Sequence, residues 1–136
     1  MRRVSQSNVA VVQALFDRFA EGGIEPTLEL FSEHVVIEIP PDMSAEPDVY
    51  HGHDGVRRYF AGFDGMIADL RYEAIEVVPA RDCVLAHTRL SGRGASSGLD
   101  VDIDAYVVHE LAGGRIARIR PYPSRDAAER AIAGAD

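Results

Sequence analysis

The residues best suited to chemistry lie in one acidic segment of the chain. Between positions 100 and 107 polar and aliphatic residues alternate strictly, as they do in a strand with two unlike faces. The polar face would carry Asp100, Asp102, Asp104 and Tyr106. A carboxyl group beside a phenol could transfer a proton or polarise a carbonyl if both groups faced a pocket. Because acidic side chains are seldom buried, residue preference alone favours an orientation with the acids in water.

Histidines are the second group that could act in catalysis or bind a metal. His51 and His53 flank Gly52, and His34 lies further towards the amino terminus. Neutral imidazole is a common metal ligand. Two histidines around a glycine, with no assured third ligand, nevertheless make a poor site. We therefore expect these histidines to cap a helix or lie at the surface, and we predict no metal site.

The composition excludes several classes of function. A formal net charge of −8 disfavours partners such as nucleic acid and anionic membrane surfaces. All 14 basic residues are arginine, so a Schiff-base mechanism, which needs a lysine amine, cannot operate, and we expect no cofactor. Cys83 is the only cysteine, so an intrachain disulfide cannot form. No apolar run approaches the ~18 residues of a spanning helix, and we expect a cytoplasmic protein.

Hydrophobic periodicity predicts the elements that must position these residues. The predicted order is a helix that ends at Gly22–Gly23, a short helix at 26–31, a strand at 34–39, a helix from about 53, strands at 70–78, 83–90, 99–110 and 115–122, and a short final helix from Ser124 or Asp126 to about 133. Early helices followed by a meander of strands indicate an α+β fold. A curved antiparallel sheet closed by helices leaves a conical hollow, the default place for a ligand. At 136 residues we expect a single domain spanning 1–136.

Two local phrases and this element order resemble the nuclear transport factor 2-like superfamily, and in particular its SnoaL-like branch. The phrases are Tyr50-His51-Gly52-His53-Asp54-Gly55-Val56 and Gly114-Arg115-Ile116 with Arg120-Pro121-Tyr122. The resemblance covers nearly the whole chain. It implies a cone-shaped, curved antiparallel sheet with three N-terminal helices packed on its concave face, a short C-terminal helix, and a homodimer formed through the outer sheet face. This fold hosts isomerases, cyclases, epoxide hydrolases, dehydratases and non-catalytic binders.

The chain departs from the residues that the best-known members of this superfamily use. Ketosteroid isomerases combine a tyrosine on the first helix, an aspartate base after the first strand and a protonated aspartate on the penultimate strand. Here those positions match Leu15 or Phe16, Ile39, and Tyr106. The acid that cyclases and epoxide hydrolases place near the last strand has no counterpart before Asp126. The resemblance therefore does not imply a classical ketosteroid isomerase.

The same resemblance implies that Tyr106, and with it Asp104, points into the cone. Burial would then raise the pKa of Asp104 and suit it to acid–base work, while the hydroxyl of Tyr106 could polarise a carbonyl. The aliphatic face of the strand would pack against a partner subunit or an outer layer. The predicted ligand-binding residues are Phe16, Ile37, Ile39, Tyr59, Phe63, Val84, Ala86, Leu90, Val108 and Ile119.

From these features we predict a protein with a pocket for a small-molecule ligand. One hypothesis is a cofactor-independent acid–base enzyme of the isomerase, cyclase or dehydratase type that acts on a small, largely apolar metabolite. The alternative is a non-catalytic ligand-binding protein or dimeric scaffold that lacks the catalytic groups of the superfamily. An enzyme needs a carboxyl or imidazole group inside the cone, a binder needs only walls, and a scaffold would fill the cone with its own side chains.

Overall fold

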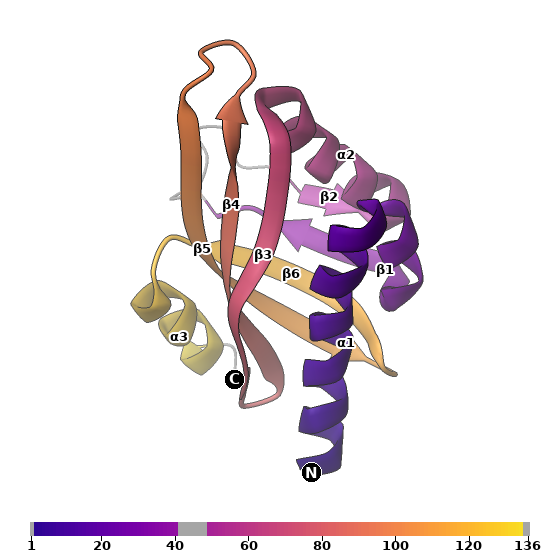
Figure 1. Ribbon diagram of the computed structural model, residues 1–136. Coiled ribbons are helices and arrows are strands. Elements are labelled where there is room, and N and C mark those ends of the chain that lie inside the picture. The colour runs from indigo at the N-terminus through magenta and orange to yellow at the C-terminus, as the bar shows by residue number, and fades with distance from the viewer. Residues whose placement is uncertain (1, 41–48, 135–136) are drawn as a thin grey trace.

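The computed structural model describes residues 2–40 and 49–134, and Figure 1 shows their arrangement. The elements in chain order are α1 (Arg2–Gly22), the 3₁₀ helix η1 (Glu25–Leu30), β1 (Phe31–Glu38), β2 (Val49–His51), α2 (Gly52–Met66), β3 (Ile67–Ala80), β4 (Cys83–Gly94), β5 (Asp100–Ala112), β6 (Arg115–Tyr122) and α3 (Arg125–Gly134). The predicted order of elements is confirmed. Strand β2 was not predicted, and most of the loop expected before it lies outside the described residues.

The strands form one six-stranded sheet in the order β2-β1-β6-β5-β4-β3. Strands β3 to β6 form the predicted antiparallel meander. The pair β1 and β6 is parallel, so the sheet is mixed and not wholly antiparallel as expected. The reason is the connection through α2, which takes the chain from β2 at one edge to β3 at the other. The meander then returns to β1 from the far side and ends with β6 running in the same direction as β1.

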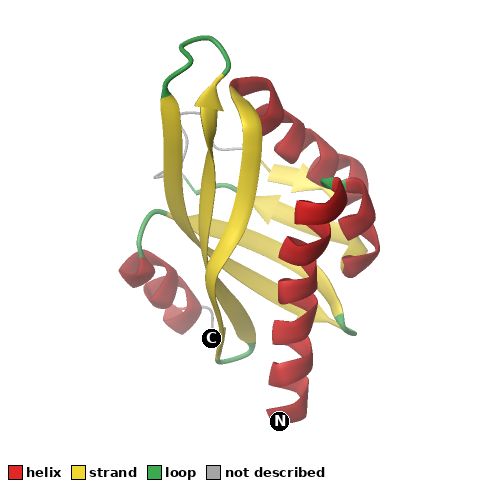
Figure 2. Cartoon of the chain, in the orientation of Figure 1, coloured by secondary structure: helices red, strands yellow, loops and turns green. Residues whose placement is uncertain are grey.

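The sheet curls so that its two faces are covered by different helices. Figure 2 shows α1 and α2 on one side of the strands and α3 on the other. The main core joins the concave face of the sheet to α1, η1 and α2, and includes Val12, Leu15, Phe31, Ile37, Val56 and Ile116. A smaller core lies on the convex face, where Ala128 and Ile132 of α3 pack against Leu85 and Val108. The predicted α+β cone is therefore confirmed.

Two helix ends follow from their sequences. Gly23 has a φ of 74°, and its backbone N–H donates to the carbonyl of Phe19 at 2.9 Å, which ends α1 where the glycine pair predicted. The hydroxyl of Ser124 accepts a hydrogen bond from the backbone N–H of Ala127 at 3.1 Å and caps α3. The predicted cap of α2 by His53 or Asp54 is wrong. That helix begins at Gly52, after an N-cap residue without a side-chain capping bond.

Gly92 near the end of β4 allows β3 and β4 to approach closely. Its φ is 152°, and a Cβ atom there would lie 2.6 Å from the carbonyl oxygen of Ala68. A backbone oxygen held in a sheet cannot move cheaply, so Gly92→Ala should destabilise the fold by about 2 kcal/mol. Urea unfolding measures this difference. As the matched control, Gly62→Ala in α2 meets no atom within 4 Å and should leave stability unchanged or raise it. Equal midpoints for the Gly92→Ala variant and the wild-type protein would contradict the expected crowding.

Candidate functional site

A cavity of about 350 Å³ lies between the concave face of the sheet and α2. Helix α2 contributes Tyr59, Phe63 and Met66 to its wall, and the strands contribute most of the remainder. The apolar part of the wall comprises Ile39, Phe63, Met66, Leu90, Ile103, Ala105, Val107 and Pro121. The side chains of Met66 and Ile103 are 62% and 44% exposed, so they lie at the mouth. The volume is at the small end of the ~300–1,000 Å³ typical of ligand pockets.

The polar groups of the cavity are hydroxyls. Among the described residues that line it, only Tyr50, Tyr59, Tyr72 and Thr88 carry polar side chains. The hydroxyl of Thr88 donates to the carbonyl of Ala105 at 3.2 Å. The rings of Tyr50 and Tyr59 meet edge to face, with their centroids 5.4 Å apart. No carboxyl or imidazole group belongs to this described lining, so proton abstraction would have to come from elsewhere.

Burial keeps two of these phenols neutral. It raises the pKa of Tyr59 well above the ordinary tyrosine value, and the nearby Tyr50 adds to the effect. Burial also raises the pKa of Tyr72, with a further contribution from Tyr59 and a smaller opposing one from a hydrogen bond with Thr88. Protonated phenols can donate or accept hydrogen bonds, but they are poor general bases. The cavity is therefore equipped to recognise a neutral polar group.

The structure divides the predicted ligand-binding residues among four places. Ile39, Tyr59, Phe63 and Leu90 lie in the cavity wall, and they stay predicted ligand contacts. Phe16 lines a second hollow between α1 and β3. The predicted residues Ile37, Val84, Ala86 and Ile119 belong to the buried core of the concave side. Val108 lies in the core on the other face of the sheet.

The sequence interpretation missed several residues of the cavity wall. Tyr72 and Thr88 supply hydroxyls, and Ile103 and Ala105 form part of the wall on β5. The signal that could have found them is the alternation itself, because Thr88 is two residues from the predicted Leu90 and must share its face. Ala105 pairs directly with Thr88 across the β4–β5 ladder, which places both on the concave side.

The expected orientation of Asp104 and Tyr106 is wrong. The ladder between β4 and β5 runs from Cys83 to Arg93 without a bulge, so the faces alternate regularly along β5. Ile103, Ala105 and Val107 line the cavity, and the residues between them must therefore point to the convex face. Residue preference along the alternating segment favoured this arrangement, whereas the superfamily resemblance implied the opposite face. Neither side chain is positioned to act on a molecule in the cavity.

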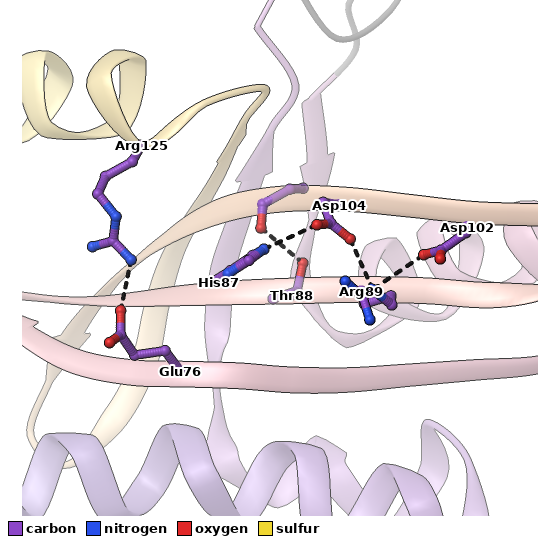
Figure 3. Close-up of polar contacts among 8 residues, drawn as sticks. Glu76, His87, Thr88, Arg89, Asp102, Asp104 and Arg125 are labelled. Carbon is purple, nitrogen blue, oxygen red and sulfur yellow. Dashed lines mark hydrogen bonds and ion pairs between the residues drawn. The ribbon is translucent and has the colours of Figure 1, made fainter.

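On the convex face Asp104 belongs to a network of ion pairs (Figure 3). The Nε of Arg89 donates to Asp104 at 3.0 Å and lies 3.1 Å from Asp102, and the Nε2 of His87 lies 3.2 Å from Asp104. The hydrogen bonds from Arg89, which has the larger effect, and from His87 lower the pKa of Asp104. The carboxyl group is thus kept ionised, which is the opposite of the raised pKa that a buried acid–base residue would need.

Tyr106 lies in the same surface network. Its ring stacks on the ring of His87 with centroids 4.4 Å apart and an interplanar angle of 15°. The guanidinium of Arg125, which also pairs with Glu76 at 2.6 Å, lies 5.4 Å from the centre of the Tyr106 ring. These contacts tie the start of α3 to β3, β4 and β5. Tyr106 therefore serves the packing of α3 on the convex face.

The homodimer predicted from the sequence relied on an aliphatic outer face. The structure instead places Ile103 and Ala105 in the cavity wall and leaves charged residues such as Asp102 and Arg89 on the outer face. The homodimer stays a prediction, and it no longer has an aliphatic strand face as its basis.

Two further observations concern the described residues as a set. No three His, Cys, Asp or Glu side chains within 2–40 and 49–134 are grouped as ligands of a metal ion would be. No helix in the same part of the chain is both long and apolar enough to cross a membrane.

Comparison with known proteins identifies the kind of domain. Residues 12–119 match the sequence profile of the SnoaL-like domain. No curated protein matches the chain.

Several solved structures share the fold at low sequence identity. Bal32a, from a soil-derived mobile gene cassette, superposes with a TM-score of 0.75 at 19% identity and covers 88% of this chain and 90% of its own. A proposed SnoaL-like polyketide cyclase from Jannaschia sp. CCS1 gives 0.74 at 20% identity, with 98% and 96% covered. TerC, co-crystallised with polyporic acid, gives 0.73 at 18% identity, with 94% and 99% covered. At these identities the likeness establishes the fold and not the activity.

Proposed function

The chain belongs to the SnoaL-like domain family, and from that premise we propose that it binds a small, neutral and largely apolar organic molecule in its cone. One observation carries the proposal: the cavity of about 350 Å³ has a described wall that is apolar except for four hydroxyl groups. Apolar area supplies most of the binding free energy, and a few hydroxyls fix the orientation of the ligand. This volume supports a ligand-binding protein over a pure scaffold, whose own side chains would fill the cone.

The ligand should be neutral because the described wall offers no charge to pair with. Bringing an ionised group into such a cavity removes its hydration and gives hydroxyl groups in return, at a net cost. A carbonyl, ether or hydroxyl group can instead bond to the phenols of Tyr59 and Tyr72, which burial keeps protonated. A compact ring system with one or two oxygen substituents meets these requirements.

The hydroxyl cluster also favours a second candidate, an enzyme of the isomerase or cyclase type. Tyr72 and Thr88 lie together in the wall, and a protonated phenol can hydrogen-bond to a carbonyl and stabilise negative charge that develops there. This candidate requires a base that is not among the described lining residues. The two candidates differ in outcome, since a binder returns its ligand unchanged and an enzyme returns a product.

A matched pair of probes tests the proposal. 2-Acetylnaphthalene and 2-naphthoate have similar size and shape, but only the second is charged at neutral pH. Calorimetric or fluorescence titration should find that the ketone binds and that the carboxylate binds about tenfold more weakly or not at all. Stronger binding of the carboxylate, or no binding of any neutral aromatic ketone below about 1 mM, would refute the proposed function. Proton NMR of the recovered ketone, which detects an isomer of unchanged mass, then distinguishes binding from turnover.

A further inference from the structure

A second hollow of about 270 Å³ lies beside the ligand cavity, between α1 and β3. Its lining is mixed, with an apolar part formed by Phe16, Ala20, Ala74, Ile75 and Val77 and a polar part formed by Gln13, Asp17, Glu73 and Glu76. Among the described residues, Tyr72 alone lines both this second hollow and the cavity under α2. One side chain on β3 thus borders both spaces. If it were absent, a single ligand could occupy the two together.

The position of Tyr72 is well determined by its neighbours. Its ring centroid lies 4.9 Å from that of Phe16, 5.4 Å from that of Phe60 and 5.6 Å from that of Phe19. Three aromatic contacts from two helices hold the ring in place between the hollows. On the side of the second hollow the ring of Phe16 packs against that of Tyr72, while the nearby residues Ala20 and Ala74 are small and leave space beside the two rings.

We propose that Tyr72 is a partition that sets the length of the ligand. This inference rests on the proposed function, because it assumes a ligand in the cavity under α2. With the phenol in place, an apolar molecule must fit within the cavity of about 350 Å³. Without it, the cavity opens into the second hollow, and a longer molecule can extend an apolar chain along Phe16 and Val77. Tyr72 is therefore a specificity-determining residue for ligand size.

A homologous series of probes measures this role. We would titrate 2-acylnaphthalenes with acyl chains of increasing length against wild-type protein and the variants Tyr72→Ala, Tyr72→Leu and Tyr72→Phe. The wild-type affinity should pass through an optimum and fall for longer chains. Tyr72→Ala should move the optimum to longer chains and strengthen binding of the longest probe about tenfold. Tyr72→Phe keeps the ring, so it should keep the wild-type optimum even where losing the hydroxyl weakens binding of every probe.

The Tyr72→Leu variant provides a second measurement in case Tyr72→Ala does not fold. It removes less volume and should shift the optimal acyl-chain length in the same direction. An unchanged optimum in both Tyr72→Ala and Tyr72→Leu would overturn the inference while leaving the proposed function intact. If no probe binds even the wild-type protein, the proposed function fails instead. The partition itself can still be tested in that case, since a crystal structure of Tyr72→Ala should show one continuous cavity. Two separate hollows in that structure would overturn it.

Discussion

Lowering the pH from about 6.5 to about 4 should cost the folded protein about 3 kcal/mol through one side chain, His109. This residue is fully buried on β5, with 0% of its surface exposed. Its Nδ1–H donates to the carbonyl of Val84 at 3.3 Å, and its Nε2 has no hydrogen-bond partner among the described residues. A proton on Nε2 would therefore place a cation in the core whose second N–H has no hydrogen-bond acceptor among the described residues.

The direction in which stability changes with pH follows from which state, folded or unfolded, binds the proton more readily. Burial lowers the pKa of His109 to about 4, and the hydrogen bonds of its ring with the backbone at Val84 and Val107 oppose the shift only in part. The unfolded chain binds the proton near pH 6.5, so between these values the unfolded state carries one more proton than the folded state. The contribution to stability is complete above about 6.5, falls as the pH drops to about 4, and falls no further below it.

The measurement compares urea unfolding of the wild-type protein and of His109→Leu across this pH range. Carboxyl groups titrate in both proteins, so the difference between the two slopes isolates the histidine. Stability of His109→Leu should change less with pH. At neutral pH the variant loses the hydrogen bond to the carbonyl of Val84 but also removes the unpartnered Nε2, so its stability should lie within about 2 kcal/mol of wild type. Parallel pH profiles in the two proteins would contradict the expectation. An NMR titration of the His109 ring gives an independent value.

The order of elements could be read from the sequence because their signals are local. The glycine pair after α1, the serine before α3 and the alternating strands each act within a few residues. The parallel pairing of β1 with β6 could not be read in this way. It depends on the path of α2 across the whole sheet, and no local pattern records that path.

The candidate site was only partly predictable for a related reason. The alternation along β5 predicts correctly that its aliphatic residues line the cavity. The position that the superfamily resemblance assigned to Tyr106 predicted the opposite face. Residues such as Val84 and Ile119 were rightly predicted to face the concave side, but they belong to the buried core of that side. Which inward residues remain uncovered depends on how far α1 and α2 extend across the cone. That extent is a property of tertiary packing and not of any one strand.

Filling the cavity from its floor should abolish ligand binding. Ala105 is buried on β5 and its side chain faces the cavity opposite Tyr59 and Phe63 of α2. In Ala105→Phe the added ring must occupy space that the ligand needs, and we expect affinity for 2-acetylnaphthalene to fall about a hundredfold or more. Ala105 belongs to the buried core but borders the cavity, so the added ring can enter existing space and the fold should lose no more than about 3 kcal/mol.

The neighbouring position provides a matched control. Asp104→Phe adds the same ring one residue away, on the convex face, where the side chain of Asp104 is 41% exposed. Its affinity for the ketone should stay within about twofold of wild type, since no part of the ring can reach the cavity. The two variants together test which face of β5 meets the ligand. Loss of binding in Asp104→Phe with wild-type binding in Ala105→Phe would reverse the assignment, and it would return Asp104 to the site that the superfamily register first implied.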